Sequence, residues 1–224
     1  MGQRSLQAVL FDLDGTLLDT APDFALVLNI MKRRRDQQCI PYARVRETVS
    51  DGARALVTMA FNIQPDEPDF EPLRAELLSL YDQHLGTETR PFEGIPELLG
   101  ALGDRQLPWG VVTNKPSWLA EPLLQRISLH PPMSVLICPD HVTHTKPDPE
   151  PMLLACTRLH TQPAHTVYIG DHDRDIQAGR AAGMPTVAAA YGYVHSAAAV
   201  ASWQADFEVG HASDILPLLQ HHFL

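Results

Sequence analysis

Polar side chains able to do chemistry follow short apolar runs at four places in this chain of 224 residues. In chain order they are Asp12 and Asp14 after the run 8–11, Thr113 and Asn114 after 109–112, Lys146 in the loop after 135–137, and Asp171 and Asp175 after 167–169. If these runs are parallel strands, their carboxyl ends meet at the edge where open α/β sheets bind ligands. The pattern therefore predicts one site that combines carboxylates, an ammonium, a hydroxyl and an amide.

Carboxylates grouped in this way repel one another unless a cation neutralises them. Mg²⁺ suits the site best, because it accepts one or two carboxylates and completes its shell with water and substrate phosphate. Zinc is disfavoured because no histidine or cysteine has ligand spacing at these positions. A magnesium site beside a lysine and a hydroxyl is suited to phosphoryl transfer, in which positioning and charge neutralisation supply the catalysis.

Asp12 and Asp14 are two residues apart, so at the end of an extended strand their side chains share a face. One carboxylate could attack phosphorus, as in aspartyl-phosphate chemistry. The other could protonate the leaving alkoxide and then deprotonate the attacking water. Taken alone, the stretch is equally consistent with a plain turn after a strand, and the other three loops favour the catalytic interpretation.

The elements expected to position these residues alternate between strand and helix. The four apolar runs are interpreted as buried strands, with a weaker fifth at 186–188, and helical patterns cover 94–106, 117–128, 149–160, 173–183 and 214–222. Continuous apolar strands separated by helices indicate a parallel sheet covered on both faces. The predicted fold class is α/β, with a doubly wound, Rossmann-like parallel sheet.

The segment 19–86 breaks this alternation because it contains no convincing strand. Helical patterns cover 22–36, 43–62 and 68–85, and a Pro-rich turn at 64–68 separates the last two. A helical block after the first strand of an α/β domain indicates an inserted subdomain. We expect residues 1–18 and 87–224 to form the core domain and residues 19–86 to form an α-helical cap domain.

The composition excludes several other classes of protein. Seventeen Lys and Arg against 27 Asp and Glu give a formal charge of −10, which disfavours nucleic-acid binding because a phosphate backbone needs a basic face. No stretch approaches the ~18 apolar residues of a membrane span. The three cysteines form no close pair, which fits a reducing compartment. We expect a cytoplasmic protein that contacts neither nucleic acid nor membrane.

The four motifs resemble those of the haloacid dehalogenase superfamily, and the resemblance covers the whole chain. They are Asp12-Leu13-Asp14-Gly15-Thr16, Thr113, Lys146, and Gly170-Asp171 followed by Asp175. The resemblance implies that Asp12 is the nucleophile and Asp14 the general acid and base. Dehalogenases of the superfamily lack the second acid, so its presence favours phosphoester chemistry.

The same resemblance assigns the remaining site residues. It implies that Thr113 binds the transferring phosphoryl group, with Asn114 beside it for the substrate, and that Lys146 stabilises the phosphoaspartate. Asp12, the backbone carbonyl of Asp14, and Asp171 would hold Mg²⁺. Asp175 would support the ion from behind these ligands or through water.

The helical insertion resembles the cap of the phosphoglycolate phosphatase branch. A cap that closes over the site excludes water and contacts the part of the substrate away from phosphate, so cap residues should set specificity. Arg54 is the candidate, although an ordinary exposed arginine is an equal interpretation. Short runs such as 52–55, 146–151 and 191–193 are similar to those of the pseudomonad enzymes that hydrolyse N-acetylmuramic acid 6-phosphate in peptidoglycan recycling.

Alternative functions remain open at the level of sequence. The small phosphorylated substrate could instead be 2-phosphoglycolate, which also carries a phosphate and a carboxylate. A phosphomutase uses the same core and the same phosphoaspartate but returns the phosphoryl group to a sugar. A non-catalytic phosphate-binding module could share the fold. The oligomeric state is not indicated.

Overall fold

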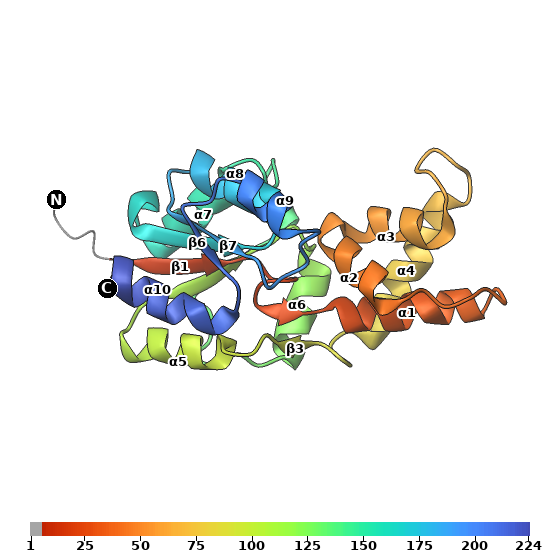
Figure 1. Ribbon diagram of the computed structural model, residues 1–224, viewed down its shortest axis with the longest axis horizontal. Coiled ribbons are helices and arrows are strands. Elements are labelled where there is room, and N and C mark those ends of the chain that lie inside the picture. Colours follow the sequence, from red (N-terminus) through yellow and green to blue (C-terminus); the bar gives the residue numbers. More distant parts are fainter. Residues whose placement is uncertain (1–5) are drawn as a thin grey trace.

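A six-stranded parallel sheet forms the centre of the computed structural model, which describes residues 6–224 (Figure 1). The strands are β1 (Ala8–Phe11), β4 (Trp109–Val112), β5 (Val135–Ile137), β6 (Thr166–Gly170), β7 (Thr186–Ala189) and β8 (Phe207–Val209). Their order is β5-β4-β1-β6-β7-β8, with every neighbouring pair parallel. The five predicted strands are confirmed, and β8 is an edge strand that the apolar pattern did not reveal.

Helices cover both faces of this sheet, as the continuous apolar strands require. They are α5 (Ile95–Asp104), α6 (Ser117–Arg126), α7 (Glu150–Leu159), α8 (Asp173–Ala181), α9 (Ala197–Ser202) and α10 (Ile215–His222). In Figure 1, α7, α8 and α9 lie above the sheet and α5 and α10 lie below it. The predicted doubly wound α/β class is therefore confirmed. Within residues 6–224, no helix is both long and apolar enough to cross a membrane.

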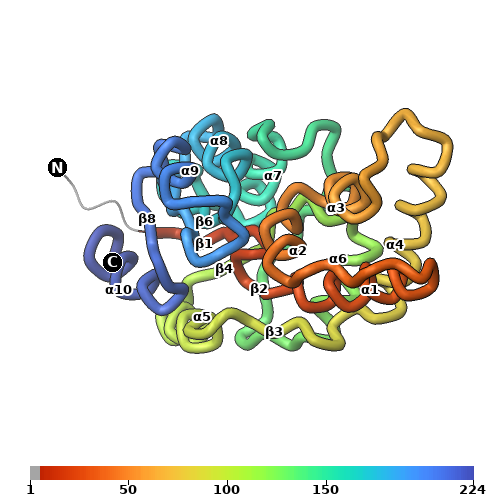
Figure 2. Tube along the Cα trace, turned by 45° about the vertical axis from the view of Figure 1, so that its right-hand side comes forward, coloured from red at the N-terminus to blue at the C-terminus, as the bar shows by residue number. Residues whose placement is uncertain are grey.

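Four helices extend from one end of the sheet (Figures 1 and 2). They are α1 (Ala21–Arg33), α2 (Tyr42–Thr48), α3 (Gly52–Phe61) and α4 (Phe70–His84). The expectation of one continuous helix over 43–62 is wrong, because a 3₁₀ turn at Val49–Asp51 separates α2 from α3. Gly52 has φ = +86°, a left-handed conformation that glycine adopts without steric cost and that interrupts the helix.

The helical segment joins the sheet through two short strands that lie side by side. Strand β2 (Leu18–Asp19) pairs antiparallel with β3 (Arg90–Pro91). The buried carboxylate of Asp23 fastens the returning chain, because it accepts hydrogen bonds from Gly86 N at 2.8 Å, Glu88 N at 2.7 Å and the Thr89 hydroxyl at 2.6 Å. Both ends of the helical segment are thus held at one place.

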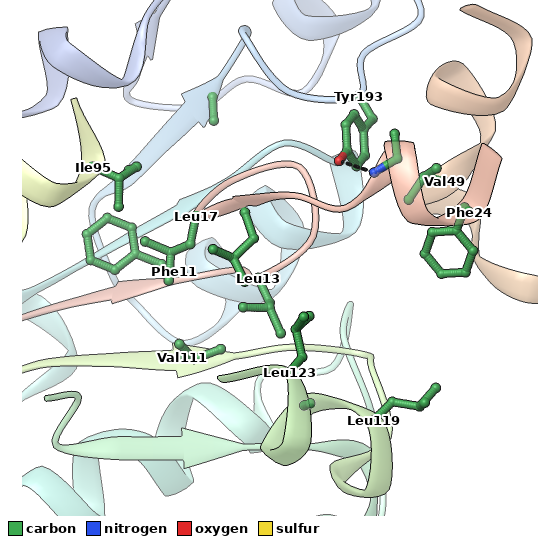
Figure 3. Packing of buried hydrophobic residues seen from close by; sticks show 14 of the residues in the cluster. Phe11, Leu13, Leu17, Phe24, Val49, Ile95, Val111, Leu119, Leu123 and Tyr193 are labelled. Atoms are coloured by element: carbon green, nitrogen blue, oxygen red, sulfur yellow. Dashed lines mark hydrogen bonds between the residues drawn. The ribbon is translucent and has the colours of Figure 1, made fainter. Parts of the chain in front are cut away.

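One hydrophobic core runs from the sheet into the helical segment. Figure 3 shows Phe11 and Val111 of the sheet in the same packed layer as Leu13 and Leu17, with Phe24 of α1 further along. The hydroxyl of Tyr193 accepts a hydrogen bond from the backbone N–H of Ala21 at 2.8 Å, which ties the first turn of α1 to the core (Figure 3). This continuous packing fixes the helices over the carboxyl ends of the strands.

Candidate active site

The site lies where three adjacent strands end. Asp12 follows β1, Thr113 follows β4 and Asp171 follows β6. Because β1 lies between β4 and β6, the chain winds to opposite sides at this point, and open α/β sheets bind ligands at such a reversal. The sheet therefore presents two carboxylates and a hydroxyl to one crevice.

A cavity of about 330 Å³ opens between this edge of the sheet and the helical segment. The core contributes Asp12, Asp14, Thr113, Asn114, Lys115 and Lys146 to its wall, and the helical segment contributes Phe24, Ser50, Asp51, Arg54, Arg74 and Leu78. Asp171 and Asp175 lie beside Asp12, and the three carboxylates bring oxygens within 4.8 Å of one another. The structure thus brings the predicted core residues together and places Arg54 on the wall that the helices form.

Lys146 is the most heavily engaged side chain of the site. Its ammonium donates to Oδ1 of Asp12 at 2.8 Å, to Oδ1 of Asp175 at 2.7 Å and to the carbonyl oxygen of Val112 at 2.9 Å. The side chain is buried, and burial alone would lower its pKa, but the two carboxylates outweigh this effect and hold the pKa above its usual value. The ammonium is therefore charged at every physiological pH.

Asp12 is a largely buried carboxylate, with its side chain 13% exposed, beside that ammonium. Burial raises its pKa, Lys146 lowers it and Asp175 raises it again, and the pKa lies above its ordinary value. Its backbone N–H donates to the carbonyl oxygen of Ile169 at 2.9 Å, so the residue is fixed between β1 and β6. A carboxylate that is poorly solvated and rigidly held is available as a nucleophile or a metal ligand.

Asp171 receives hydrogen bonds from three parts of the chain. Its Oδ1 accepts from the Thr16 hydroxyl at 3.1 Å, and its Oδ2 accepts from the Ser50 hydroxyl and from Tyr193 N, both at 2.9 Å. Burial raises the pKa of Asp171 to about 8, and the charges of Asp12 and Asp175 act in the same direction. Hydrogen bonds thus hold this carboxyl in place, while burial and the neighbouring carboxylates disfavour its charged form.

The glycines beside Asp171 show how closely the backbone approaches it. A Cβ at Gly15 would overlap the Asp171 carboxylate, and a Cβ at Gly192 would overlap its Cβ. Three carboxyl groups with their oxygens close together, two of them with a raised pKa, are the donor set that a hard divalent cation prefers. The residues present therefore fit Mg²⁺.

Asp175 has both of its oxygens engaged by the protein, as Asp171 does, and one of them contacts an ammonium. Oδ1 accepts from Lys146 at 2.7 Å, and Oδ2 accepts from the backbone N–H of His172 at 3.1 Å. The second bond is part of a reciprocal cap at the start of α8, in which the His172 ring accepts from Arg174 N. Asp175 is therefore placed to orient Lys146.

Asp14 points into the cavity between a hydroxyl and an ammonium. Its Oδ1 accepts from the Thr20 hydroxyl at 2.6 Å and from Lys115 Nζ at 3.0 Å. Lys115 also donates to the Tyr81 hydroxyl of α4 at 2.9 Å and lies over the Tyr81 ring. Burial opposes the charge of Lys115, but Asp14 and Tyr81 together raise its pKa. One lysine thus connects the carboxylate of the core to the helical segment.

Thr113 and Asn114 complete the core side of the cavity. The Thr113 oxygen accepts from Lys115 N at 3.1 Å, which leaves its hydroxyl proton free to donate to a ligand. The Asn114 amide donates to the carbonyl oxygen of Lys146 at 3.0 Å. Its own oxygen is buried and has no hydrogen-bond partner among residues 6–224, so it can accept from a bound molecule.

The turn between α2 and α3 closes against the core beside the carboxylates. Besides the hydrogen bond from Ser50 to Asp171, the backbone carbonyl of Ser50 accepts from the Arg174 guanidinium. Asp51 lies 3.3 Å from the His172 ring, and this hydrogen bond, with nearby positive groups, lowers the pKa of Asp51 although burial opposes it. His172, which directly follows Asp171, therefore faces the helical segment.

Several residues of the site were not assigned by sequence. Lys115 follows Thr113 and Asn114 at the same strand end, where its position is visible in the sequence but its role is not. Thr20, Tyr81, Ser50 and Arg74 carry no such signal, because their approach to the site depends on how the helices pack on the sheet. Arg54 lies on the cavity wall as expected, in an ion pair with Glu71 at 3.2 Å.

The fold and the site together define a class of protein. A doubly wound sheet with paired carboxylates and a buried lysine at its switch point, under an inserted helical segment, is typical of α/β enzymes that act on small anionic molecules. The family model for haloacid dehalogenase-like hydrolases matches residues 9–189. The chain belongs to this family of hydrolases.

Several relatives cover almost the whole chain. An N-acetylmuramic acid 6-phosphate phosphatase of Pseudomonas aeruginosa is 49% identical over 219 residues, which is 98% of this chain and 97% of the relative. A phosphoglycolate phosphatase of Xanthomonas campestris is 44% identical and covers 91% of each chain. The crystal structure of a predicted phosphoglycolate phosphatase from Haemophilus somnus superimposes with a TM-score of 0.84 at 26% identity, over 96% of this chain and 98% of that one. These relatives are named as phosphatases.

Proposed function

We propose that this protein is a magnesium-dependent phosphomonoesterase that works through a phosphoaspartate intermediate. The observation that carries the proposal is the arrangement of Asp12, Asp14 and Lys146. Asp12 lies 2.8 Å from the buried ammonium of Lys146, and Asp14 lies on the wall of the same cavity with its own cation, Lys115, at 3.0 Å. One carboxylate is thus set to attack and the other to exchange protons with the ester oxygen.

The reaction then proceeds in two steps. A carboxylate oxygen of Asp12 attacks phosphorus, the ester P–O bond breaks, and Asp14 gives its proton to the leaving alkoxide. Asp14 next takes a proton from a water molecule whose oxygen attacks phosphorus, and the P–O bond to Asp12 breaks to release inorganic phosphate. Lys146 and the Thr113 hydroxyl hold the phosphoryl oxygens while their charge changes.

Asp12, Asp171 and the backbone carbonyl of Asp14 would hold the magnesium ion. When bound, the ion neutralises the phosphoryl oxygens and the carboxylates that otherwise repel one another. Asp175 supports this set by orienting Lys146 through the 2.7 Å contact. Thr16, Ser50 and the backbone of Tyr193 fix the direction of the Asp171 carboxylate.

Residues 19–86 serve as the cap domain, and residues 1–18 with 87–224 serve as the core domain. The first five residues of this core lie outside the described part of the chain. Support comes from the paired strands β2 and β3, through which both connections pass, and from the cavity between the helices and the sheet. The cap excludes water from the phosphoaspartate and contacts the part of the substrate away from phosphate.

The substrate we propose is N-acetylmuramic acid 6-phosphate, so that the enzyme serves peptidoglycan recycling in the cytoplasm. The Pseudomonas aeruginosa relative, at 49% identity over nearly the full length, supports this choice. The cavity of about 330 Å³ supports it as well, because it has the size of a small-molecule site rather than of a slot for a two-carbon acid.

A second candidate substrate is 2-phosphoglycolate. The Xanthomonas campestris relative, at 44% identity, favours it by name. Both molecules offer a phosphate for Asp12 and a carboxylate for a cap arginine, so they differ in the bulk between the two groups. A preference for the smaller acid would require the cap to close further than it does around the present cavity.

The test is phosphate release from both esters with Mg²⁺, beside 4-nitrophenyl phosphate and an Asp12→Asn control. We expect a kcat/KM for the muramic acid ester well above that for phosphoglycolate, and no turnover by the variant. Hydrolysis of the aryl ester but of neither candidate would support the proposed reaction and contradict both proposed substrates. Appreciable turnover by Asp12→Asn would overturn the phosphoaspartate mechanism.

A further inference from the structure

Helices α3 and α4 carry three charged side chains at or next to the cavity that the hydrolytic steps do not use. Arg54 Nη1 lies 3.2 Å from Oε1 of Glu71, and Arg74 Nη1 lies 3.1 Å from Oε2 of the same carboxylate. Each carboxylate oxygen therefore meets a different guanidinium. Both arginines line the cavity, on the helical side of it.

The electrostatics of the cavity favour a ligand with more than one negative charge. Its lining includes five cationic side chains, Arg54, Arg74, Lys115, Lys146 and Arg174, against three anionic ones, Asp12, Asp14 and Asp51. The protein as a whole has a formal charge of −10, so the cationic side chains are concentrated on the lining of this cavity, with Glu71, Asp171 and Asp175 behind it. Two of the five cations are already engaged with Asp12 and Asp14, which leaves the arginines on the helical wall as the attraction for a second anionic group.

The contact between Glu71 and the arginines can be exchanged at little cost. The side chains of Glu71 and Arg54 are each 57% exposed, and that of Arg74 is 34% exposed. Ion pairs at such exposed positions contribute little to stability, so another carboxylate can take the place of Glu71 without unfolding the helices. Arg54 is also kept in orientation by the Phe70 ring, whose centroid lies 5.1 Å from the guanidinium carbon.

We propose that Arg54 and Arg74 form the binding site for the carboxylate of the substrate, and that Glu71 occupies this site in the free enzyme. The inference deepens the proposed function and rests on it for the phosphate end, which Asp12, Thr113 and Lys146 hold at the opposite wall. A substrate that carries a phosphate and a carboxylate spans the cavity and displaces Glu71. A phosphate ester without a carboxylate leaves Glu71 in place and binds more weakly.

The test compares two ligands that differ only in the lactyl group, which carries the carboxylate. N-acetylmuramic acid 6-phosphate and N-acetylglucosamine 6-phosphate share the sugar, the amide and the phosphate, and only the first has the lactyl acid. Their dissociation constants are measured by calorimetry with Mg²⁺ in the Asp12→Asn background, where no hydrolysis occurs. The quantity of interest is the ratio of the two constants.

The variants are expected to move this ratio in opposite directions. Arg74→Gln or Arg54→Gln should reduce the preference for the acid about tenfold, the factor for one charge-assisted hydrogen bond. Glu71→Gln removes the competing carboxylate and should increase the preference about threefold. Arg44→Gln, which removes an exposed arginine elsewhere on the helical segment, should leave the ratio unchanged.

A purely structural ion-pair cluster would behave differently. If the three side chains only fastened α3 to α4, Glu71→Gln and Arg74→Gln would change the affinity for both ligands in the same direction and by the same factor, which would overturn the inference. Equal affinity for the two ligands before any substitution would overturn it as well.

Failure of the proposed function is recognised separately. The acid could bind more tightly, with a preference that the variants change, while the protein with Asp12 releases no phosphate. This outcome would support the carboxylate site and contradict the proposed enzyme activity. If the acid is hydrolysed but substitutions of Arg54, Arg74 and Glu71 leave the ratio of the two dissociation constants unchanged, the proposed activity stands and the proposed carboxylate site is wrong.

Discussion

The hydroxyl of Ser50 donates a hydrogen bond to Oδ2 of Asp171 at 2.9 Å. Ser50 belongs to the turn between α2 and α3, and Asp171 follows the strand β6 of the sheet. The residue that positions the helical wall therefore also orients a carboxylate proposed to bind the metal. This hydrogen bond therefore links the helical wall to the proposed metal site.

The first prediction concerns this contact. Ser50→Ala removes one of the three donors to Asp171, and a hydrogen bond of this kind contributes about 1 kcal/mol. We expect kcat/KM to fall about fivefold and the Mg²⁺ concentration for half-maximal activity to rise. Ser79→Ala, at an exposed position on α4, serves as the matched control. Unchanged kinetics and metal dependence in Ser50→Ala would contradict the coupling.

The second prediction concerns the cation beside Asp14. Lys115→Met removes the ammonium that contacts Asp14 at 3.0 Å and the Tyr81 hydroxyl at 2.9 Å. Without it Asp14, the proposed general acid, loses its orientation, and we expect kcat to fall about 100-fold, within the range for proton-transfer catalysis. Tyr81→Phe retains the lysine and should lose much less. Phosphate-release assays compare the two variants, and circular dichroism checks that both are folded. A normal kcat in Lys115→Met would show that Lys115 does not orient Asp14.

The third prediction concerns stability. Lys146 is buried between Asp12 and Asp175, so Lys146→Met leaves their charges without a partner. Breaking a buried ion pair from one side costs about 3–5 kcal/mol, and urea denaturation should show a loss of that size. Mg²⁺ should restore part of the stability in this variant, since a cation again neutralises the acids. A variant as stable as the parent protein would show that the carboxylates are protonated or well solvated.

The fourth prediction follows from the raised pKa of Asp171, which lies at about 8. Below that pH the metal-free protein holds a proton on this carboxyl, and Mg²⁺ must displace it. Affinity for Mg²⁺ should therefore rise between pH 6 and pH 8 and level off above. In the metal-free protein the same carboxyl contributes stability at low pH, and this contribution is lost as the pH rises from its usual pKa of 3.8 through about 8.

Calorimetric titration with Mg²⁺ in buffers of different ionisation enthalpy measures the proton that is released. We expect proton release at pH 6.5 and almost none at pH 9. Asp171→Asn should abolish binding, whereas Asp104→Asn, at an exposed position on α5, should not affect it. Affinity that is independent of pH across this range would contradict the assignment.

The fifth prediction concerns the cysteines. Cys39 is exposed, whereas Cys138 and Cys156 are buried, and burial raises the pKa of the Cys138 thiol to about 12. The thiolate is the reactive form, so a thiol reagent at pH 7.5 should label one cysteine per chain. Mass spectrometry of the intact protein counts the labels, and Cys39→Ser should take up none.

Much of the fold could be predicted because its signal is local. Continuous apolar runs and the polar residues after them located the five central strands, and the helices between them were correct to within a few residues. Strand β8 was missed because Phe207–Val209 is short and half exposed at the edge of the sheet, where no apolar run is needed. The helix expected over 43–62 was wrong because one glycine with φ = +86° outweighs the surrounding pattern.

Only part of the site could be predicted from the sequence. Asp12, Thr113 and Asp171 could be placed together because strand ends of a parallel sheet meet by topology. Tyr81 and Arg74 lie on α4, whose position over the sheet depends on tertiary packing that no local pattern encodes. Asp175 and Lys146 share a contact across 29 positions of the chain, which their separate motifs do not reveal.

The pairing of β2 with β3 has a consequence for how this chain can change over generations. The helical segment leaves the sheet and returns to it at neighbouring positions, Leu18 opposite Pro91 and Asp19 opposite Arg90. Its two ends are thus already adjacent, so a segment of different size or sequence can be inserted there without rethreading the sheet. The length and sequence of the helical segment can therefore vary while the strand order of the sheet stays the same.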